Sequence, residues 1–307
     1  MARRKKGQKI DGWINLDKPL GLTSTQAMAK VRRILDAQKA GHAGTLDPLA
    51  SGILPIALGE ATKTIPFAQD HLKTYEFTVT WGEQRDTDDS EGEIIARSDE
   101  RPTQDAIIAA LPAFIGDIEQ IPPKFSAIKI DGQRAYDLAR DGEAFEIKPR
   151  EVYIESLDLL ATRENEVDLT MTCGKGTYVR ALARDLAHAL GTYGYISALK
   201  RTAVGPFAIK NAISLEKLEE MGINAPQALL PLETALDDIP ALAIKEGETA
   251  DLRNGRFLSF VSRADFARLE QSGIEQHDEA LALYNGQPVA LVEIEGPKIK
   301  PVRVFNI

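Results

Sequence analysis

A tight, glycine-rich loop near the start of the chain places one aspartate in a fixed position. Residues 41–55 read GHAGTLDPLASGILP. The glycines permit positive φ angles and close backbone approach, while Pro48 favours an extended conformation at the preceding residue, Asp47. Because the neighbouring side chains are small and apolar, this carboxylate should be partly desolvated and should need a cationic partner to stay ionised. Asp47 is therefore a candidate catalytic acid, base or nucleophile.

The same local pattern has a simpler interpretation. An aspartate before a proline commonly forms an Asx-turn that shapes a loop and does nothing else. On turn chemistry alone, this structural interpretation of Asp47 is favoured over the catalytic one.

Length and composition limit the class of protein. With 307 residues, the chain is long enough for one large core and a smaller unit. No apolar run approaches the roughly twenty residues of a membrane span, and the N-terminal sequence ARRKK lacks the apolar core of a secretory signal. We therefore expect a soluble, cytoplasmic protein. One cysteine and four histidines without paired spacing argue against structural zinc and disulfides.

The charge distribution leaves two interpretations open. A formal net charge of −9 argues against nucleic-acid binding through bulk charge, because neutralisation of phosphates by lysine and arginine usually dominates such affinity. Basic residues nevertheless cluster in four short segments, at 3–6, 30–33, 124–134 and 200–201. A focused basic patch and ordinary solvated faces are about equally compatible with this pattern.

Hydrophobic periodicity predicts a mixed α/β fold. Alternating apolar residues indicate half-buried strands at 73–82 and 167–173, and shorter apolar runs indicate strands at 13–16 and 53–58. Helical spacing predicts a helix after a cap at Thr23 or Ser24, a short helix at 60–68 and another at 177–190. Strands and helices alternate irregularly, and a proline-rich break at 120–124 introduces a basic insertion. This order favours a mixed sheet over a doubly wound one.

The last part of the chain reads as a separate β-rich unit. Residues 222–240 contain three prolines and are interpreted as a connection. Beyond them, Asn285-Gly286 between two apolar runs predicts a hairpin, and residues 301–305 predict a last short strand.

Five ordered motifs resemble those of the TruB-type pseudouridine synthases, the bacterial tRNA pseudouridine-55 synthase family. The resemblance covers nearly the whole chain, and the second motif, which contains Asp47, is highly specific. The motifs are GWINLDKPLGLTS at 12–24, KAGHAGTLDPLASGILP at 39–55, KTYE at 73–76, CGKGTYVR at 173–180 and LKRTAVGPF at 199–207.

This resemblance implies a domain organisation. It implies a catalytic domain of the pseudouridine synthase type over 1–230, built on a mixed, largely antiparallel sheet, with an RNA-clasping insertion at about 123–150. A small β-rich domain over 237–307 resembles a PUA-type RNA-binding domain, and this part of the resemblance is weaker.

It also implies a reaction and a substrate. The enzyme would be an isomerase, an intramolecular transferase that converts uridine 55 in the T-loop of tRNA to pseudouridine without cofactor or metal. The N1–C1′ glycosidic bond would break, and C5 of the uracil would then bond to C1′. By this match Asp47 is the essential carboxylate, either attacking C1′ or removing a sugar proton, and the sequence leaves both routes open.

Two further residues take catalytic roles by the same match. Arg180, in the first turn of a predicted helix, would hold the Asp47 carboxylate and keep it ionised. Tyr75 would stack on the target base with its hydroxyl near C5, as a platform and a candidate base. Without the motifs, the simpler interpretations are a surface ion pair for Arg180 and a core residue for Tyr75.

The remaining site expectations concern substrate and RNA binding. A stacked uridine must be extruded, and His42 is a candidate to occupy the vacated place, although an ordinary hydrogen-bonded histidine is equally compatible. Lys18 would lie near a phosphate or the catalytic loop, and Leu199 beneath the base. Tyr178 in the arginine motif and Lys129 in the insertion are also expected to bind RNA.

The chain departs from the family pattern at one position. The family motif G-x-x-T-D-T-x-D here reads GEQRDTDD over 82–89, so that Arg85 replaces threonine while Asp86, Thr87 and Asp89 remain. We expect a changed loop and unchanged chemistry.

Two other functions remain as alternatives. The chain could be a non-catalytic folding factor that binds the T-arm of tRNA as an RNA chaperone. A carboxylate glycosidase would need a second carboxylate about 5–9 Å from Asp47, and the sequence offers acids only at 83–100. The sequence indicates no protein partner, so a monomer is the expected state.

Overall fold

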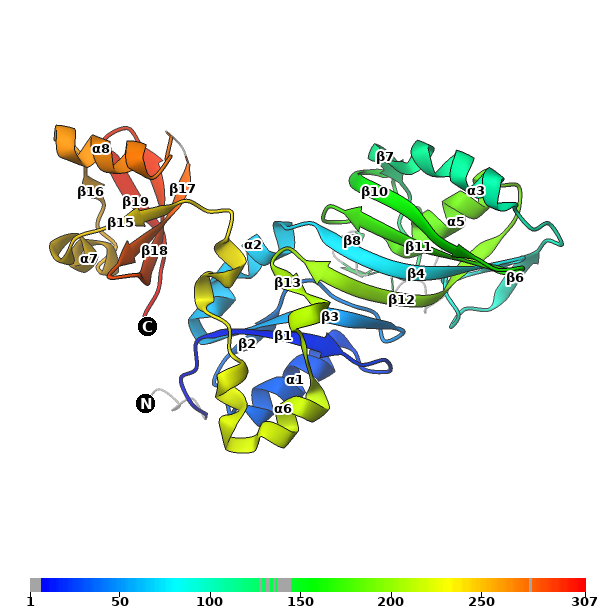
Figure 1. The fold of residues 1–307 in the computed structure, drawn as a ribbon, viewed down its shortest axis with the longest axis horizontal. Coiled ribbons are helices and arrows are strands. Elements are labelled where there is room, and N and C mark those ends of the chain that lie inside the picture. Colours follow the sequence, from blue (N-terminus) through cyan, green and yellow to red (C-terminus); the bar gives the residue numbers. More distant parts are fainter. Residues whose placement is uncertain (1–6, 127–128, 131–132, 135, 137–144, 276–277) are drawn as a thin grey trace.

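The computed structural model describes the chain except residues 1–6, 127–128, 131–132, 135, 137–144 and 276–277. Figure 1 shows a large part built on one long sheet and a smaller β-rich part at the C-terminal end. The expected mixed α/β fold with a β-rich C-terminal part is confirmed. In the described part of the chain, no helix is both long and apolar enough to cross a membrane.

A ten-stranded mixed sheet forms the large part. Its strands pair mainly antiparallel, but β1 runs parallel to β14, and β3 runs parallel to β12. In spatial order the main path is β14 (Ile213–Ser214), β1 (Gly12–Lys18), β3 (Ala50–Leu58), β12 (Gly194–Val204), β4 (Lys73–Trp81), β11 (Glu166–Cys173), β10 (Arg150–Thr162) and β7 (Gly116–Gln120). The short strands β2 (Ala40–His42) and β13 (Phe207–Ala208) pair with β3 and β12.

Two other short ladders lie outside this sheet. Strands β5 (Glu83–Arg85) and β6 (Ile94–Arg97) form one pair, and β8 (Lys129–Ile130) and β9 (Gln133–Arg134) form the other. The second pair falls inside the expected insertion at 123–150, part of which (127–128, 131–132, 135 and 137–144) lies outside the described residues.

Helices cover the sheet where the sequence has apolar stripes. Helix α1 (Ser24–Ile34) begins at the predicted cap, because Thr23 accepts a hydrogen bond from the Gln26 backbone and forms a capping box. The large part also contains α2 (Ile65–Asp70), α3 (Gln104–Ala110), α5 (Val179–Ala189), α6 (Leu215–Met221) and the 3₁₀ turns η1 (Gly59–Thr64), η2 (Leu111–Phe114) and η3 (Ile209–Asn211).

The single helix expected at 60–68 is wrong. The chain forms the 3₁₀ turn η1 and then starts a new helix, α2, with Pro66 in its first turn. Proline has no backbone N–H and suits the first turn of a helix better than its interior, so Pro66 marks a beginning there.

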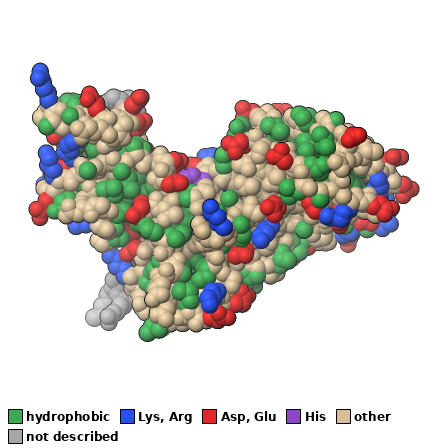
Figure 2. All heavy atoms as spheres, viewed as in Figure 1, with side chains coloured by type: hydrophobic (Ala, Val, Ile, Leu, Met, Phe, Trp, Pro, Cys, Tyr) green, Lys and Arg blue, Asp and Glu red, His purple; other side chains and the backbone are tan. Residues whose placement is uncertain are grey.

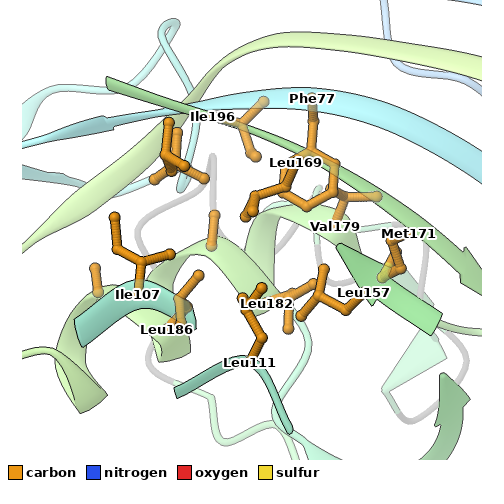
Figure 3. Packing of buried hydrophobic residues seen from close by; sticks show 14 of the residues in the cluster. Phe77, Ile107, Leu111, Leu157, Leu169, Met171, Val179, Leu182, Leu186 and Ile196 are labelled. Carbon is orange, nitrogen blue, oxygen red and sulfur yellow. The ribbon is translucent and has the colours of Figure 1, made fainter. Parts of the chain in front are cut away.

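Two of the hydrophobic cores among the described residues pack helices onto the sheet. In one, α3 and α5 pack on β4, β10, β11 and β12, and Figure 3 shows Leu182 and Leu186 of α5 beside Ile107 and Leu111. In the other, α1 and α6 pack on β1 and β3. Tyr75 of β4 and Leu199 of β12 pack against both cores. These two residues therefore sit where the two halves of the large part meet.

The smaller part is a five-stranded sheet with two helices. Its strands are, in spatial order, β15 (Ala241–Ala243), β17 (Glu279–Tyr284), β18 (Gln287–Glu295), β19 (Lys298–Val304) and β16 (Leu258–Ser259), and its helices are α7 (Glu246–Arg253) and α8 (Arg263–Gln271). Asn285 and Gly286 both have positive φ, 49° and 75°, and join β17 to β18 as the hairpin predicted.

The expected connection at 222–240 is packed against the large part. It contains the 3₁₀ turns η4 (Gly222–Ala228) and η5 (Leu232–Leu236), and the indole of Trp13 donates a hydrogen bond of 3.1 Å to the Leu232 carbonyl. Trp13 shares a buried cluster with Leu281 and Phe305 of the smaller part. Figure 2 shows a hollow between the two parts, on a face where acidic and basic side chains are interspersed.

The close backbone approach expected of the loop glycines can be tested at Gly52, where β3 pairs with β12. Gly52 has a φ of +97°, and a Cβ atom there would lie 2.2 Å from the Arg201 carbonyl oxygen of β12. Gly116 has a similar φ of +94° with nothing within 4 Å of its Cβ position. We expect Gly116→Ala to cost about 1–2 kcal/mol of backbone strain, and Gly52→Ala to cost at least about 1 kcal/mol more. Urea denaturation measures both; equal costs would contradict the close approach.

Candidate functional site

Asp47 lies in the loop between β2 and β3, which is anchored through its main chain. The Leu46 N–H donates to the Ser24 hydroxyl at 2.7 Å, and this hydroxyl donates back to the Leu46 carbonyl at 2.9 Å. The Gly21 N–H donates to the Pro48 carbonyl at 2.8 Å. The carboxylate itself remains 46 % exposed. The loop therefore presents a fixed but accessible carboxylate.

A buried arginine holds this loop from the side of the sheet. Arg201 of β12 is 1 % exposed, and its guanidinium donates to the Ile53 carbonyl at 2.7 Å and to the Gly44 carbonyl at 3.0 Å. A Cβ atom at Gly44 would lie 3.2 Å from Nη1 of Arg201. Close approach to Arg201 thus explains two loop glycines, Gly44 and Gly52. Sequence reasoning recorded Arg201 only as a basic residue of the fifth motif and missed this contact.

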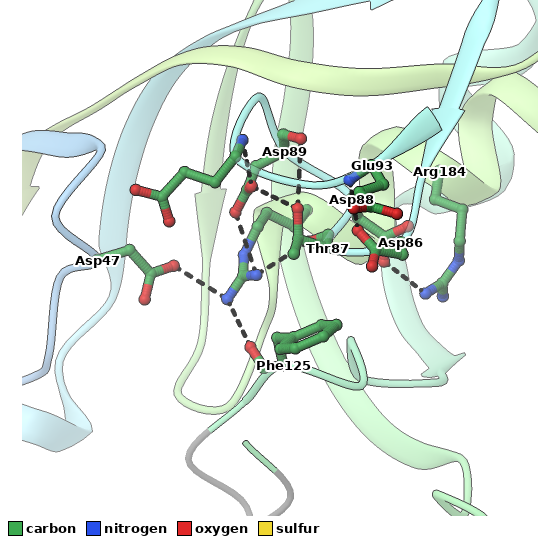
Figure 4. A network of polar contacts seen from close by, with 10 residues as sticks. Asp47, Asp86, Thr87, Asp88, Asp89, Glu93, Phe125 and Arg184 are labelled. Carbon is green, nitrogen blue, oxygen red and sulfur yellow. Dashed lines mark hydrogen bonds and ion pairs between the residues drawn. The ribbon is translucent and has the colours of Figure 1, made fainter. Parts of the chain in front are cut away.

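A second arginine binds the Asp47 carboxylate. Arg180, in the first turn of α5, places Nη2 at 3.0 Å from Oδ2 of Asp47, and its side chain is 9 % exposed. The same guanidinium donates to the Thr87 and Phe125 carbonyls at 3.0 Å each and pairs with Asp89 at 3.2 Å. Figure 4 shows Asp47, Thr87, Asp89 and Phe125 converging from separate segments. Arg180 therefore fixes the direction of the Asp47 carboxylate.

The loop at 86–89 supplies acids that the sequence analysis did not name as site residues. Asp89 accepts hydrogen bonds from the Thr87 hydroxyl at 2.6 Å and the Glu91 N–H at 3.0 Å, and it is itself nearly buried. Asp88 has a positive φ of 59° and pairs with Arg184 at 2.9 Å. The match of Asp86, Thr87 and Asp89 to the family pattern D-T-x-D was the available signal. Because the Asp89 side chain is only 10 % exposed, it lacks the open face that the second carboxylate of a glycosidase needs.

Arg85, the departure from the family motif, stabilises this loop. Its guanidinium donates to the Ser90 and Gly92 carbonyls at 3.3 and 3.1 Å and pairs with Glu83 at 2.9 Å. It also lies 4.4 Å from the centre of the Tyr195 ring. Arg85 thus contacts the loop, and its described interactions do not include Asp47.

Lys18 pairs in register with Gly52, beside the Asp47 loop, and is fully buried. Its ammonium donates to the Leu22 carbonyl at 2.7 Å and the Pro19 carbonyl at 3.0 Å. Burial lowers the pKa of Lys18 to about 8, and the charge of Asp47 partly opposes this shift. Lys18 therefore lies near the Asp47 loop, which is one of its two expected environments.

Tyr75 and Leu199 lie on adjacent central strands. In the register, Tyr75 of β4 is opposite Arg201 of β12, and Leu199 of β12 is opposite Phe77, two residues along β4. Burial raises the pKa of Tyr75, and Asp47 adds to that shift. The phenol is therefore neutral at neutral pH and lies close enough to Asp47 to respond to its charge.

The other expected binding residues differ in how far the structure describes them. His42 ends β2; burial and then Arg201 lower its pKa, and its Nδ1 has no hydrogen-bond partner among the described residues. Tyr178 precedes α5, and its backbone N–H and carbonyl both bond to the Gln120 side chain, at 2.8 and 3.1 Å. Lys129 lies in β8, but its side chain falls outside the described residues.

The assembled site suits the breaking of a glycosidic bond. A half-exposed carboxylate can stabilise or capture positive charge at an anomeric carbon, and a neutral tyrosine beside an apolar residue can face a planar base. Among the described residues, one group of histidine and acidic side chains could share a metal ion: His71, Asp237 and Asp238. Asp47 is not part of this group.

Comparison with known proteins matches the sequence of this chain to one family. The family model "TruB family pseudouridylate synthase (N terminal domain)" matches residues 32–179, and "tRNA pseudouridylate synthase B C-terminal domain" matches residues 180–237. The tRNA pseudouridine synthase B of Caulobacter vibrioides is 53 % identical over 311 residues, covering 100 % of both chains. That of Bradyrhizobium diazoefficiens is 52 % identical, covering 99 % of this chain and 88 % of its own.

Solved structures agree with the sequence matches. A chain in the crystal structure of a Cbf5–Nop10–Gar1 complex superposes with a TM-score of 0.73 at 26 % identity, covering 96 % of this chain and 84 % of that one. Sequence matches over the full length and a shared fold lead to the same conclusion: this chain belongs to the TruB family of pseudouridine synthases.

Proposed function

We propose that this chain converts uridine 55 in the T-loop of tRNA to pseudouridine and that Asp47 is the catalytic carboxylate. Membership of the TruB family makes the chain a pseudouridine synthase, and the relatives named tRNA pseudouridine synthase B support tRNA as its substrate. Beyond family membership, we infer the position of the modified uridine within tRNA and the role of Asp47.

The pairing of Arg180 with Asp47 carries the catalytic assignment. A half-exposed carboxylate, held at 3.0 Å by a nearly buried guanidinium, is fixed in direction while one side stays open to a ligand. Cleavage of the N1–C1′ bond builds positive charge at C1′ and negative charge on the uracil. Asp47 would meet the first charge, either by bonding to C1′ or by taking a sugar proton.

The reaction balances without an external reactant. One carbon–nitrogen bond breaks and one carbon–carbon bond forms, the C5 proton leaves, and N1 of the uracil gains a proton, so no electron acceptor or donor is needed. Tyr75 would stack on the turned base above Leu199 with its hydroxyl near C5. Because its pKa is raised, the phenol keeps its proton, which favours the role of platform over that of base at C5.

The domain organisation divides catalysis and RNA binding between separate parts of the chain. We propose residues 1–230 as the catalytic domain, residues 123–150 as an insertion that clasps the T-arm, and residues 237–307 as a PUA-like RNA-binding domain. The separate five-stranded sheet of the smaller part supports this division. A stacked uridine must be turned out of the RNA before Asp47 can reach C1′, and we propose that His42, at the end of β2, occupies the vacated place.

Asp47→Asn tests the catalytic role. The amide keeps the shape of the carboxylate but cannot carry its charge, so we expect tritium release from tRNA labelled at C5 of uridine to fall at least about 1,000-fold. The affinity for tRNA, measured by filter binding, should stay within about twofold. Asp70→Asn is a matched control, because Asp70 also pairs with a cation, Lys175 at 2.6 Å, but is 60 % exposed. Near-normal tritium release by Asp47→Asn would remove the assignment.

The position in tRNA needs a separate test. We expect sequencing of tRNA treated with the purified protein to show one new pseudouridine, at position 55. A transcript with cytidine at position 55 should release no tritium, while a transcript with another T-loop uridine replaced should still react. Modification at a different uridine would disprove the T-loop assignment and leave the role of Asp47 to the previous experiment.

A further inference from the structure

A second arginine of α5 occupies the turn after Arg180. Arg184 pairs with Asp88 at 2.9 Å, with Asp185 at 2.9 Å, and donates to the Ile121 carbonyl at 2.8 Å. Its side chain is 16 % exposed and that of Asp88 is 7 % exposed. Figure 4 shows Arg184 and Asp88 on the far side of the network from Asp47. Arg184 does not contact Asp47 in any described interaction.

The two segments that Arg184 joins are the ones that supply partners to Arg180. Asp88 lies between Thr87 and Asp89, both of which bind Arg180. Ile121 lies four residues before Phe125, whose carbonyl accepts from the same Arg180 nitrogen that pairs with Asp47. Arg184 thus braces both groups of contacts that orient Arg180.

The segment between Ile121 and Phe125 has little freedom to move independently. Gln120 is 1 % exposed and bonds through its side chain to the backbone of Tyr178, at the start of α5. Pro122 and Pro123 follow Ile121 and restrict the backbone. A displacement at Ile121 would therefore be transmitted to the Phe125 carbonyl.

The pair of Asp88 and Arg184 is maintained at a cost in stability. Burial raises the pKa of Asp88 to about 6, although Arg184 and Arg180 both act to lower it. Because this value is above the ordinary carboxyl pKa, the folded state binds a proton more tightly, and stability falls as the pH rises through about 4 to 6. At neutral pH the buried carboxylate is thus a burden on the fold, which fits a role in placing other groups.

We infer that Arg184, held by Asp88, is a positioning residue for pseudouridine formation. It fixes Asp89 and the Phe125 carbonyl against Arg180, and through them it sets the direction of the Asp47 carboxylate. This inference rests on the proposed catalytic role of Asp47.

The test compares four variants with the wild type at saturating tRNA. We expect Arg184→Gln to slow single-turnover tritium release at least tenfold while the tRNA dissociation constant stays within twofold. Arg184→Lys should recover part of the rate, because its ammonium keeps the charge near Asp88 but has no second arm for Ile121. Asp88→Asn should slow the reaction about fivefold without lowering the melting temperature at pH 8. Arg163→Gln, which removes a more exposed arginine bound to two acids on the β10–β11 hairpin, should leave the rate unchanged.

The outcomes separate this inference from the proposed function. If Asp47→Asn is inactive but Arg184→Gln and Asp88→Asn react within twofold of the wild type, Arg184 is not a positioning residue. If the loss appears in tRNA affinity, or the rate falls only together with the melting temperature, the role is binding or structural and the inference is equally wrong. If Asp47→Asn is active, the proposed function fails instead. Should Arg184→Gln not fold, Arg184→Lys and Asp88→Asn decide the matter on the same two measurements.

Discussion

One nearly buried guanidinium, that of Arg180, joins segments that are distant in the sequence into a single site. It binds the Asp47 loop, the 87–89 loop and the Phe125 carbonyl, and these contacts exist only when all three segments are docked on α5. Removing one partner of a buried charge typically costs about 3–5 kcal/mol, because the other charge is left without compensation. The geometry of the Asp47 carboxylate is therefore inseparable from the folding of this half of the large part.

The sheet supplies the complementary constraint. Strands β4 and β12 carry Tyr75 and Leu199 through the junction of two hydrophobic cores, so neither residue can shift without disturbing both. Arg201 adds a second clamp beneath the Asp47 loop. Arg180 and Arg201 hold the Asp47 loop from the helix side and from the sheet side.

Periodicity predicted the elements better than it predicted the contacts. The alternating apolar residues from Tyr75 to Trp81 correctly indicated β4, because burial on one face of a strand repeats every second residue. The break at Pro66 was missed. The burial of Lys18 and Arg201 was missed too, because a single buried cation leaves no repeating signal in the sequence. The proximity of Arg180 and Asp47 came from the family resemblance. No local pattern could have paired residues 133 positions apart.

The way the 41–55 loop is held also bears on how its sequence can change. Ser24, Gly21 and Arg201 bind it through the main-chain groups of Leu46, Pro48, Gly44 and Ile53. Main-chain groups are present whatever the side chain, so an exposed position such as Thr45 should tolerate many substitutions. Gly44 and Gly52 are not, because their lack of a side chain is what admits Arg201. In a saturation library, tolerance should therefore alternate sharply between neighbouring positions of one loop.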